Sequence, residues 1–337
     1  MSLLAVRERV QHADPRPVGA CGPDPAPRLT TTVPREYVHR ASLAEVFLTG
    51  CEDGTGHRFA LTAQWPRAHT FFQSLDGSAH DCLLAAETVR QAGIYLSHSR
   101  LGVPLDHHFA MHDLRWTVDP DQLAIGVTPT DLQLHAVCRP ESGPGRGAKN
   151  RYELEVDVWR GAELAGTCQT RFTCLTPAVY RRLRGELPPA LALAPARADP
   201  ASMSPALVGR AHARDVVIAR TERPGRWRLI PDPRHPILFD HWTDHVPGMV
   251  LMEAARQASC ALSDPGSGFV PISMASEFQH YVEFDSPCWI EATPLPDLGP
   301  GQSGFLVTGE QEGRMVYRAE VIGRAAERAD GPALSRT

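Results

Sequence analysis

Two short stretches of the chain repeat the pattern Glu-x-x-Arg-Gln-Ala inside otherwise apolar sequence, LLAAETVRQAG (83–93) and MVLMEAARQAS (249–259). The repeated polar residues are Glu87, Arg90 and Gln91 in the first copy and Glu253, Arg256 and Gln257 in the second. At helical spacing, positions i, i+3 and i+4 share one face, so each trio projects together. A helix that is apolar on nearly every side is predicted to be buried, where charges are costly unless they are paired or used. Each trio is therefore either a structural ion pair or part of a functional site, and we favour a site because buried ionisable groups concentrate there.

These side chains suit acid–base catalysis next to an anion. A carboxylate in an apolar site has a raised pKa, which would bring Glu87 or Glu253 toward general-base catalysis. The planar fork of an arginine guanidinium fits phosphate oxygens, so Arg90 and Arg256 are candidate phosphate ligands. The two glutamines share the helix faces with these groups and are expected to contact substrate.

The loop before the second trio, DHWTDHVPGM, adds further candidates. A helix N-terminus offers free N–H groups, so the N–H of Gly248 can polarise a carbonyl oxygen. Either His245 or His241 can orient a substrate hydroxyl or act as the base, and either can equally be a solvated imidazole. Asp240 and Asp244, together with these histidines, also suggest a metal site. We do not favour that alternative, because no further distant ligand is evident.

A basic residue stands shortly before the helix loop in both halves, Arg67 in AQWPRAHTFF and Arg234 in PDPRHP. Each is a candidate second phosphate contact, with a plain surface charge as the slightly favoured alternative. The histidines that follow the first helix (107, 108 and 112) are expected to be structural or to lie at the rim. The sequence has no G-x-G-x-x-G, Walker or G-x-S-x-G pattern and no paired nucleophilic cysteine. We therefore predict direct transfer without a covalent intermediate and without a cofactor.

Composition limits the class of protein. The chain has 337 residues and a formal net charge of −5, with no basic footprint for nucleic acid. No apolar run approaches the length of a membrane span, and the N-terminal segment lacks the pattern of a signal peptide. The eight cysteines are scattered without a C-x-x-C pair. These features predict a reduced cytoplasmic protein without a disulfide framework or structural zinc.

The order of features repeats along the chain. VHRASLAEVFLT opens the first half and VGRAHARDVVIAR the second, and each half continues with an apolar stretch, Pro-Arg, a loop, the Glu-x-x-Arg-Gln helix and four β-rich segments. The last pair of segments in each half is predicted to turn at Arg-Gly or Glu-Gly. The predicted domains are 36–184 and 206–324. The flanking predictions are a disordered segment at 1–35, a Pro/Ala-rich linker at 185–205 and a tail at 325–337.

A single apolar helix accompanied by so many antiparallel strands has one economical packing, in which the sheet wraps around the helix. The predicted fold class is therefore α+β, a tandem hotdog with central helices near residues 81–98 and 248–262. The two sheets are expected to join side by side within one polypeptide, which makes the protein a monomeric double hotdog or a weak homodimer.

The start of the second helix resembles that of the 3-hydroxyacyl-carrier-protein dehydratases, whose pattern His-…-Pro-Gly-x-x-x-x-Glu-Ala-x-x-Gln it follows from Pro247 to Gln257. The loop from His241 to Pro247 is two residues shorter than in those enzymes, and Arg256 replaces a residue that is usually small there. Over residues 36–325 the chain more closely resembles the A-factor biosynthesis family of actinomycete bacteria. The segments that carry this resemblance are VHRASLAEVFLT, AQWPRAHTFF, HDCLLAAETVRQAGIYLSH, GVPLDHHFAMHDL and DHVPGMVLMEAARQA.

That resemblance implies transfer of a 3-oxoacyl group from acyl carrier protein to the hydroxyl of dihydroxyacetone phosphate, on the way to a γ-butyrolactone, butenolide or furan signal that regulates antibiotic production. It places the functional residues at Glu87, Arg90, Glu253 and Arg256. The sequence leaves open which half is catalytic. We expect Glu253 to be the base before Glu87, because the Pro-Gly helix start belongs to the second half. The alternatives are a hotdog dehydratase or thioesterase, which has no need for the arginine, and a non-catalytic acyl-thioester binder.

Overall fold

The computed structural model describes residues 30–141, 150–185, 201–263 and 269–325. Most of the predicted N-terminal segment, linker and tail lies outside these ranges, at 1–29, 186–200 and 326–337. Contacts between residues separate Met1–Thr31 from Thr32–Thr337, and the second unit contains all the strands and helices given below. Among the described helices, none combines the length and apolarity needed to span a membrane.

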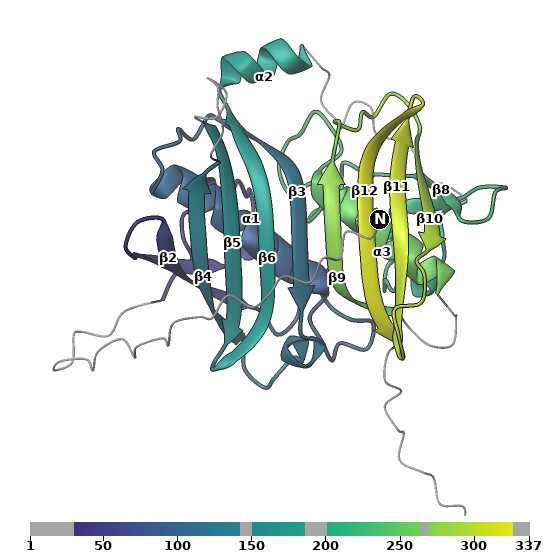
Figure 1. The fold of residues 1–337 in the computed structure, drawn as a ribbon, viewed down its shortest axis with the longest axis horizontal. Coiled ribbons are helices and arrows are strands. Elements are labelled where there is room, and N and C mark those ends of the chain that lie inside the picture. Colours follow the sequence, from purple (N-terminus) through teal and green to yellow (C-terminus); the bar gives the residue numbers. More distant parts are fainter. Residues whose placement is uncertain (1–29, 142–149, 186–200, 264–268, 326–337) are drawn as a thin grey trace, which may run out of the picture. The chain divides into compact units, whose positions relative to one another are not determined.

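Twelve strands of the described chain form one antiparallel sheet (Figure 1). They are β1 Leu48–Asp53, β2 Arg58–Trp65, β3 His108–Val118, β4 Thr130–Pro140, β5 Arg151–Arg160, β6 Glu163–Leu175, β7 Ile218–Arg220, β8 Arg226–Leu229, β9 Phe269–Phe278, β10 Cys288–Pro294, β11 Gln302–Gln311 and β12 Arg314–Ala325. Their spatial order is β1-β2-β4-β5-β6-β3-β9-β12-β11-β10-β8-β7. Read from the two outer edges toward the centre, the order is β1-β2-β4-β5-β6-β3 on one side and β7-β8-β10-β11-β12-β9 on the other. The two halves of the sheet therefore have the same topology, as expected for a duplicated unit.

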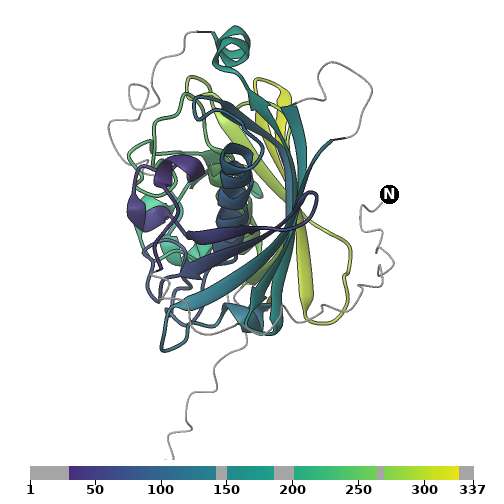
Figure 2. The same ribbon diagram turned by 90° about the vertical axis from the view of Figure 1, so that its left-hand side faces the viewer.

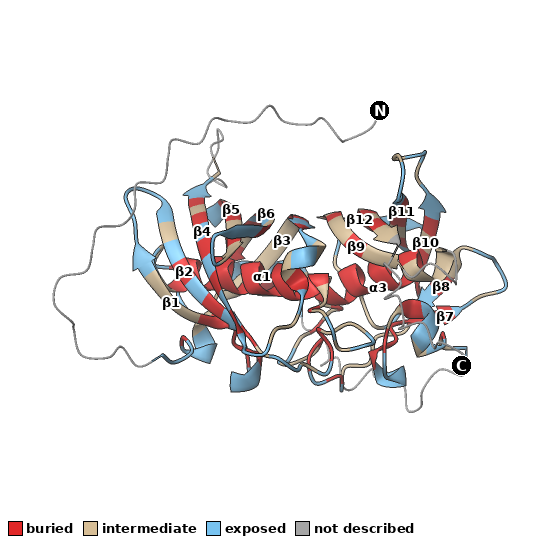
Figure 3. Cartoon of the chain, turned by 90° about the horizontal axis from the view of Figure 1, so that it is seen from below, coloured by how far each residue is buried: buried red, intermediate tan, exposed pale blue. Residues whose placement is uncertain are grey.

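Two long helices lie against one face of the sheet, α1 Cys82–Ser99 and α3 Gly248–Leu262 (Figure 2). Their bounds agree with the predicted helices at 81–98 and 248–262. Both are buried around most of their circumference (Figure 3), as their apolar sequences predict. This arrangement confirms the tandem hotdog. The domain boundaries at 36–184 and 206–324 stay a prediction.

The remaining helices are short. The third α-helix, α2 Pro177–Arg184, follows β6, and single 3-10 turns cover Arg35–Val38, Leu43–Glu45, Pro120–Leu123, Pro205–Val208 and Ala213–Asp215. The predicted hairpin turns are present, because Gly161-Ala162 separates β5 from β6 and Glu312-Gly313 separates β11 from β12. Glu312 and Gly313 both have positive φ (53° and 74°), the backbone geometry that a two-residue hairpin of the I′ type requires.

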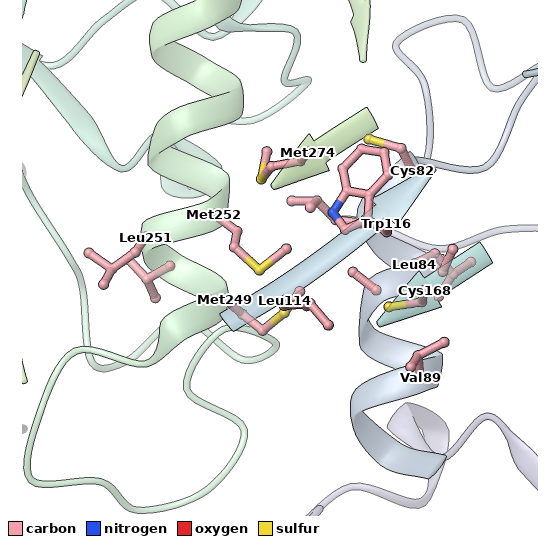
Figure 4. Packing of buried hydrophobic residues seen from close by; sticks show 14 of the residues in the cluster. Cys82, Leu84, Val89, Leu114, Trp116, Cys168, Met249, Leu251, Met252 and Met274 are labelled. Carbon is pink, nitrogen blue, oxygen red and sulfur yellow. The ribbon is translucent and has the colours of Figure 1, made fainter. Parts of the chain in front are cut away.

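The two halves join at the pairing of β3 with β9, which runs from Asp113↔Glu277 to Thr117↔Ser273. Behind this seam, apolar side chains of both helices pack on the central strands. Figure 4 shows Leu84 and Val89 of α1 on one side of β3, and Met249, Leu251 and Met252 of α3 on the other. The core is therefore continuous across the seam, and it fixes the start of α3 close to the middle of α1.

Candidate active site

A cavity of about 650 Å³ lies where the two halves meet. Its walls come from the middle of α1, the start of β3, the end of β9 and the loop that leads into α3. Five predicted site residues line it: Glu87, Arg90, His241, His245 and Gly248. The other six, which are Glu253, Arg256, Gln91, Gln257, Arg67 and Arg234, do not. The cavity thus combines the helix charges of the first half with the helix start of the second.

The carboxylate of Glu87 is fully buried at the inner end of a hydrogen-bonded cluster. Arg90 contacts it through Nε and Nη2, both at 2.8 Å, and the Nε of Arg40 lies at 3.1 Å. Gln91 donates to the same carboxylate at 2.8 Å. Burial alone would raise the pKa of Glu87, but the guanidinium groups of Arg40 and Arg90 outweigh it and hold the pKa at about 2.

The expectation of a raised carboxylate pKa is therefore wrong for both helices. Glu253 has the same surroundings, since Arg210 and Arg256 overcome the effect of burial and lower its pKa to about 2. The repeated pattern contains one arginine for each glutamate, whereas the fold brings two to each. Each glutamate is an ionised anchor for guanidinium groups.

The two arginines of the repeated pattern are left in different states. Arg90 donates hydrogen bonds to Glu87 from Nε and Nη2. Its Nη1 has no hydrogen-bond partner among the described residues, although the side chain lines the cavity. In Arg256, Nη2 bonds both Glu253 and the Val208 carbonyl, each at 2.8 Å, and Nη1 contacts the sulfur of Cys260. Arg90 can accept an anionic ligand without losing a bond, and Arg256 cannot.

The glutamines of the two trios fasten loops to the helices. Gln91 accepts from the N–H of Phe47 at 3.0 Å and donates to the Glu45 carbonyl at 2.7 Å. Gln257 repeats both bonds with Val217 and Asp215 in the second half, at 3.0 and 2.7 Å. The structure thus gives both side chains positioning contacts within the protein.

The starts of the two helices differ, and the difference decides which one can bind a carbonyl oxygen. The first turn of α1 is capped by Asp81, which accepts from the Leu83 N–H at 2.8 Å and pairs with Arg210 at 3.0 Å. The first turn of α3 follows Pro247, whose ring cannot accept a hydrogen bond, so no side chain caps the helix there. The N–H of Gly248 consequently stays available at the cavity wall. A side chain at position 248 would press on the ring of Phe278, since a Cβ there would lie 3.1 Å from it.

His245 lies beside that open helix start and is held by a buried carboxylate. Its Nδ1 is 2.6 Å from Asp244, which also accepts from the Tyr180 hydroxyl at 2.6 Å. Burial would raise the pKa of Asp244, but the hydrogen bonds from His245 and Tyr180 outweigh it and move the pKa well below its ordinary range. Asp244 is therefore a carboxylate that fixes Nδ1 of His245 as the donor and leaves Nε2 as the acceptor.

Seven histidines line the cavity: His39, His107, His108, His112, His241, His245 and His280. Among them, His245 is the one whose ring is bonded to a buried carboxylate. The partner of His107 is the exposed Asp106, and Nδ1 of His241 is 3.9 Å from Asp240. The predicted rim histidines 107, 108 and 112 are thus part of the wall.

His39 is a further polar group of the cavity wall that the sequence did not reveal. It adopts a left-handed backbone conformation (φ 51°), where the second half has Gly209. Its Nε2 is 2.9 Å from Nε2 of His98, whose Nδ1 lies 2.8 Å from the Val103 carbonyl. Burial, reinforced by His98 and Arg90, lowers the pKa of His39 to about 3, so this ring is neutral and a weak base.

The remaining candidates lie elsewhere. Arg67 is exposed and donates to the Gly126 carbonyl at 3.2 Å, and Arg234 is exposed and pairs with Asp232 at 2.8 Å. The carboxylate of Asp240 accepts from the N–H groups of Ala41 and Ser42. Within the described ranges, no group of three His, Cys, Asp or Glu side chains is arranged to hold a metal ion.

Two kinds of functional residue escaped the sequence prediction. Arg40 and Arg210 stand at the same place in the repeated openings VHRA and VGRA, which is a signal that the pattern contained. Each reaches across to the other half, since Arg40 donates to the Ile237 carbonyl and Arg210 to the Phe71 carbonyl. No comparable signal marks Tyr180, which approaches Asp244 from 64 residues away.

A stability measurement can test whether Glu253 is structural. Glu253→Gln would leave two buried guanidiniums facing a neutral amide, so we expect the free energy of unfolding at pH 7 to fall by about 3–5 kcal/mol. The folded-state pKa of about 2 lies below the ordinary value of 4.5, so this contribution is full above pH 4.5 and is lost as the pH falls through 2. Chemical denaturation at several pH values should show the wild type and the variant converging in acid. Equal stability at pH 7 would contradict a structural role.

Comparisons with known proteins agree with this geometry. The sequence profile of the A-factor biosynthesis hotdog domain matches residues 22–176 and 191–326. The chain belongs to the A-factor biosynthesis hotdog family. The resemblance drawn from its sequence motifs is therefore confirmed, and the two matched segments correspond to the two halves of the sheet.

Relatives and solved structures extend the comparison. A protein of Streptomyces virginiae named 2-oxo-3-(phosphooxy)propyl 3-oxoalkanoate synthase is 48% identical over 88% of this chain and 99% of its own length. A protein of the same name from Streptomyces coelicolor is 39% identical over 87% of this chain and 92% of its own. The solved structure of the 12:0-ACP thioesterase from Umbellularia californica covers 82% of this chain and 100% of its own, at 14% identity and a TM-score of 0.48.

Proposed function

We propose that this chain is an acyltransferase that joins a 3-oxoacyl thioester to the hydroxyl of dihydroxyacetone phosphate, giving a 2-oxo-3-(phosphooxy)propyl 3-oxoalkanoate. The observation that carries the proposal is the meeting, in one cavity, of a carboxylate-backed histidine, an uncapped helix start and an arginine whose Nη1 has no partner in the described part of the chain. The relatives carry the name of this reaction. The product is a precursor of signalling lactones in the family.

The start of α3 binds the thioester carbonyl. The Gly248 N–H donates to the carbonyl oxygen and stabilises the negative charge that develops there, assisted by the positive end of the helix. Apolar side chains that line the cavity, including Val89, Ile94 and Leu251, cover the acyl chain. A preformed donor of this kind contributes most when the carbonyl becomes tetrahedral.

His245 acts as the general base. Its Nε2 takes the proton of the acceptor hydroxyl as the oxygen attacks the thioester carbon, while Asp244 stabilises the imidazolium that forms. The C–S bond then breaks, and the proton passes from His245 to the departing thiolate. Glu87 and Glu253, with pKa values of about 2, are too weakly basic for this step, so the proton acceptor proposed here is the histidine.

Arg90 holds the acceptor phosphate through Nη1, which points the acceptor hydroxyl toward His245. Glu87 fixes the guanidinium through Nε and Nη2, and His241, which lines the same cavity, is a further donor. A phosphate ligand distinguishes this reaction from thioester hydrolysis or dehydration, because neither needs a cation in the cavity. The reaction requires no cofactor, and we place it in the cytoplasm with the acyl group carried on acyl carrier protein.

The decisive experiment incubates the purified protein with a 3-oxoacyl pantetheine thioester, with and without dihydroxyacetone phosphate, and identifies the products by mass. We expect the phosphorylated ester and free thiol when the acceptor is present, and little thiol release without it. Unphosphorylated dihydroxyacetone should be a poor acceptor, because it lacks the group that Arg90 binds. Thiol release at the same rate with and without acceptor, giving free acid, would establish a thioesterase instead.

A further inference from the structure

Helix α2 has one face fastened to the active site. Its Tyr180 donates to Asp244 and stacks on His108 with ring centroids 3.7 Å apart. One turn later, Arg184 bonds Glu283 at 2.9 Å and lies over the ring of Tyr281. These contacts hold the helix at the edge of the cavity, where β3 begins and β9 ends (Figure 1).

The opposite face of α2 is open to solvent and mixes positive charge with apolar surface. Arg181 and Arg182 are exposed and form no ion pair with any described residue. Val179 and Leu183 are 44% and 63% exposed. We call these four residues the α2 outer face.

The cavity wall also carries exposed apolar side chains. Leu105 and Trp242 both line the cavity and are 51% and 63% exposed. Single exposed apolar side chains are ordinary, but four of the ten large ones in the described chain belong to this helix or to the cavity wall. Their presence on α2 and on the cavity wall that α2 borders indicates a surface that another molecule covers.

The charge of α2 indicates what kind of molecule that is. The helix has three arginines and no acidic residue in eight positions, in a chain whose net charge is −5. A local field of one sign next to a cavity steers partners of the opposite sign toward it. A small thioester bound in the cavity would not reach the outside of α2, because Arg181 and Arg182 do not line the cavity. The positive charge of the helix therefore indicates a larger partner that is acidic.

We propose that the α2 outer face is the docking surface for an acidic carrier protein, which delivers the acyl thioester into the neighbouring cavity. The inference rests on the thioester substrate of the proposed function. Arg181 and Arg182 pair with carboxylates of the carrier, and Val179 and Leu183 cover its apolar side chains. Tyr180 and Arg184 of the same helix bond Asp244, which in turn bonds the catalytic His245. The docking residues Arg181 and Arg182 therefore lie between the two residues of α2 that position Asp244.

Charge reversal tests the inference by comparing two forms of one substrate. The variant combines Arg181→Glu with Arg182→Glu, and the matched control combines Arg58→Glu with Arg314→Glu, two exposed arginines on other elements. A 3-oxooctanoyl group is supplied either on acyl carrier protein or on pantetheine. We expect KM for the carrier-bound substrate to rise about tenfold or more in the α2 variant, with kcat and KM for the pantetheine thioester unchanged. The control should match the wild type with both.

Direct binding separates this inference from the proposed function. Fluorescence anisotropy of labelled acyl carrier protein should show weaker binding to the α2 variant than to the wild type and the control, whether or not an ester is formed. Equal binding of all three proteins would overturn the docking surface. A loss of activity with both thioesters at unchanged carrier binding would also overturn it, because α2 would then only support Asp244. Failure of the wild type to form the ester from pantetheine thioester would refute the acyltransferase while leaving the binding result to decide the docking surface.

Discussion

His245→Ala should slow transfer of the acyl group from thioester to dihydroxyacetone phosphate by about 10²–10⁴-fold, the range for loss of a positioned general base. The fold should survive, because the side chain lies at the cavity wall and Asp244 keeps its bonds to Tyr180 and Arg184. The measurement is the single-turnover rate of thiol release, together with the free energy of unfolding. KM for both substrates should change little, since the imidazole acts on the proton that moves in the transition state.

The control for this prediction is His241→Ala, which removes a second histidine from the same cavity. Its Nδ1 is 3.9 Å from the buried carboxylate of Asp240, beyond hydrogen-bond distance, so we expect the rate of transfer to fall by less than about tenfold. Asp244→Asn should resemble His245→Ala, because an amide in this place favours the wrong tautomer. A His245→Ala variant with a near-normal rate would show that His245 is not the general base. Another group in the cavity wall would then have to take the proton of the acceptor hydroxyl.

The sequence predicted the fold well because the fold depends on local patterns. Apolar periodicity and turn residues placed α1, α3 and the hairpins at Gly161 and Gly313 within a residue or two. The duplication was visible as a repeated order of features. Hydrophobic patterning of this kind is a property of neighbouring residues and needs no knowledge of the partner surface.

The site was harder to predict because its residues come together across the seam. Sequence proximity favoured Glu253, which follows the Pro-Gly helix start by one turn and a half. In the structure, the start of α3 shares its cavity with Glu87 of the other helix. Neither segment alone indicates which glutamate lies near which helix start, because the pairing of β3 with β9 determines how the two helices are placed relative to each other.

Duplication followed by divergence explains why one of the two equivalent places is open. At the first, an uncapped Pro247-Gly248 start meets Arg90, whose Nη1 bonds none of the residues that the structure describes. At the second, Asp81 caps the helix start and pairs with Arg210, while Arg256 is fully bonded beneath Gly209. The carboxylate of Asp81 binds the Leu83 N–H and an arginine, and so occupies the helix start that a substrate oxygen would need. The second place therefore stabilises the double hotdog, and the first is available for chemistry.

This asymmetry makes Arg90 and Arg256 a matched pair for mutation. Arg90→Ala should raise KM for dihydroxyacetone phosphate about ten- to a hundredfold, which corresponds to the loss of about 1.5–3 kcal/mol from a charged hydrogen bond. KM for the thioester should stay nearly constant, because the acyl chain lies against apolar side chains and the Gly248 N–H. Arg256→Ala should instead lower the free energy of unfolding, since it strips the buried Glu253 of one of its two cations and breaks the bond to the Val208 carbonyl.

The two variants must therefore be compared by both measurements, initial rates at varied concentrations of each substrate and denaturant unfolding. Both variants remove one of two cations from a buried glutamate and should lose stability, and the split that we expect is a kinetic defect with the phosphorylated acceptor for Arg90 alone. Activity with unphosphorylated dihydroxyacetone sharpens the comparison, because Arg90→Ala removes nothing that this acceptor uses and should leave its rate unchanged. An Arg256→Ala protein of normal stability but impaired acceptor KM would show that the second place also binds phosphate. An Arg90→Ala protein with both KM values raised equally would make Arg90 a structural partner of Glu87.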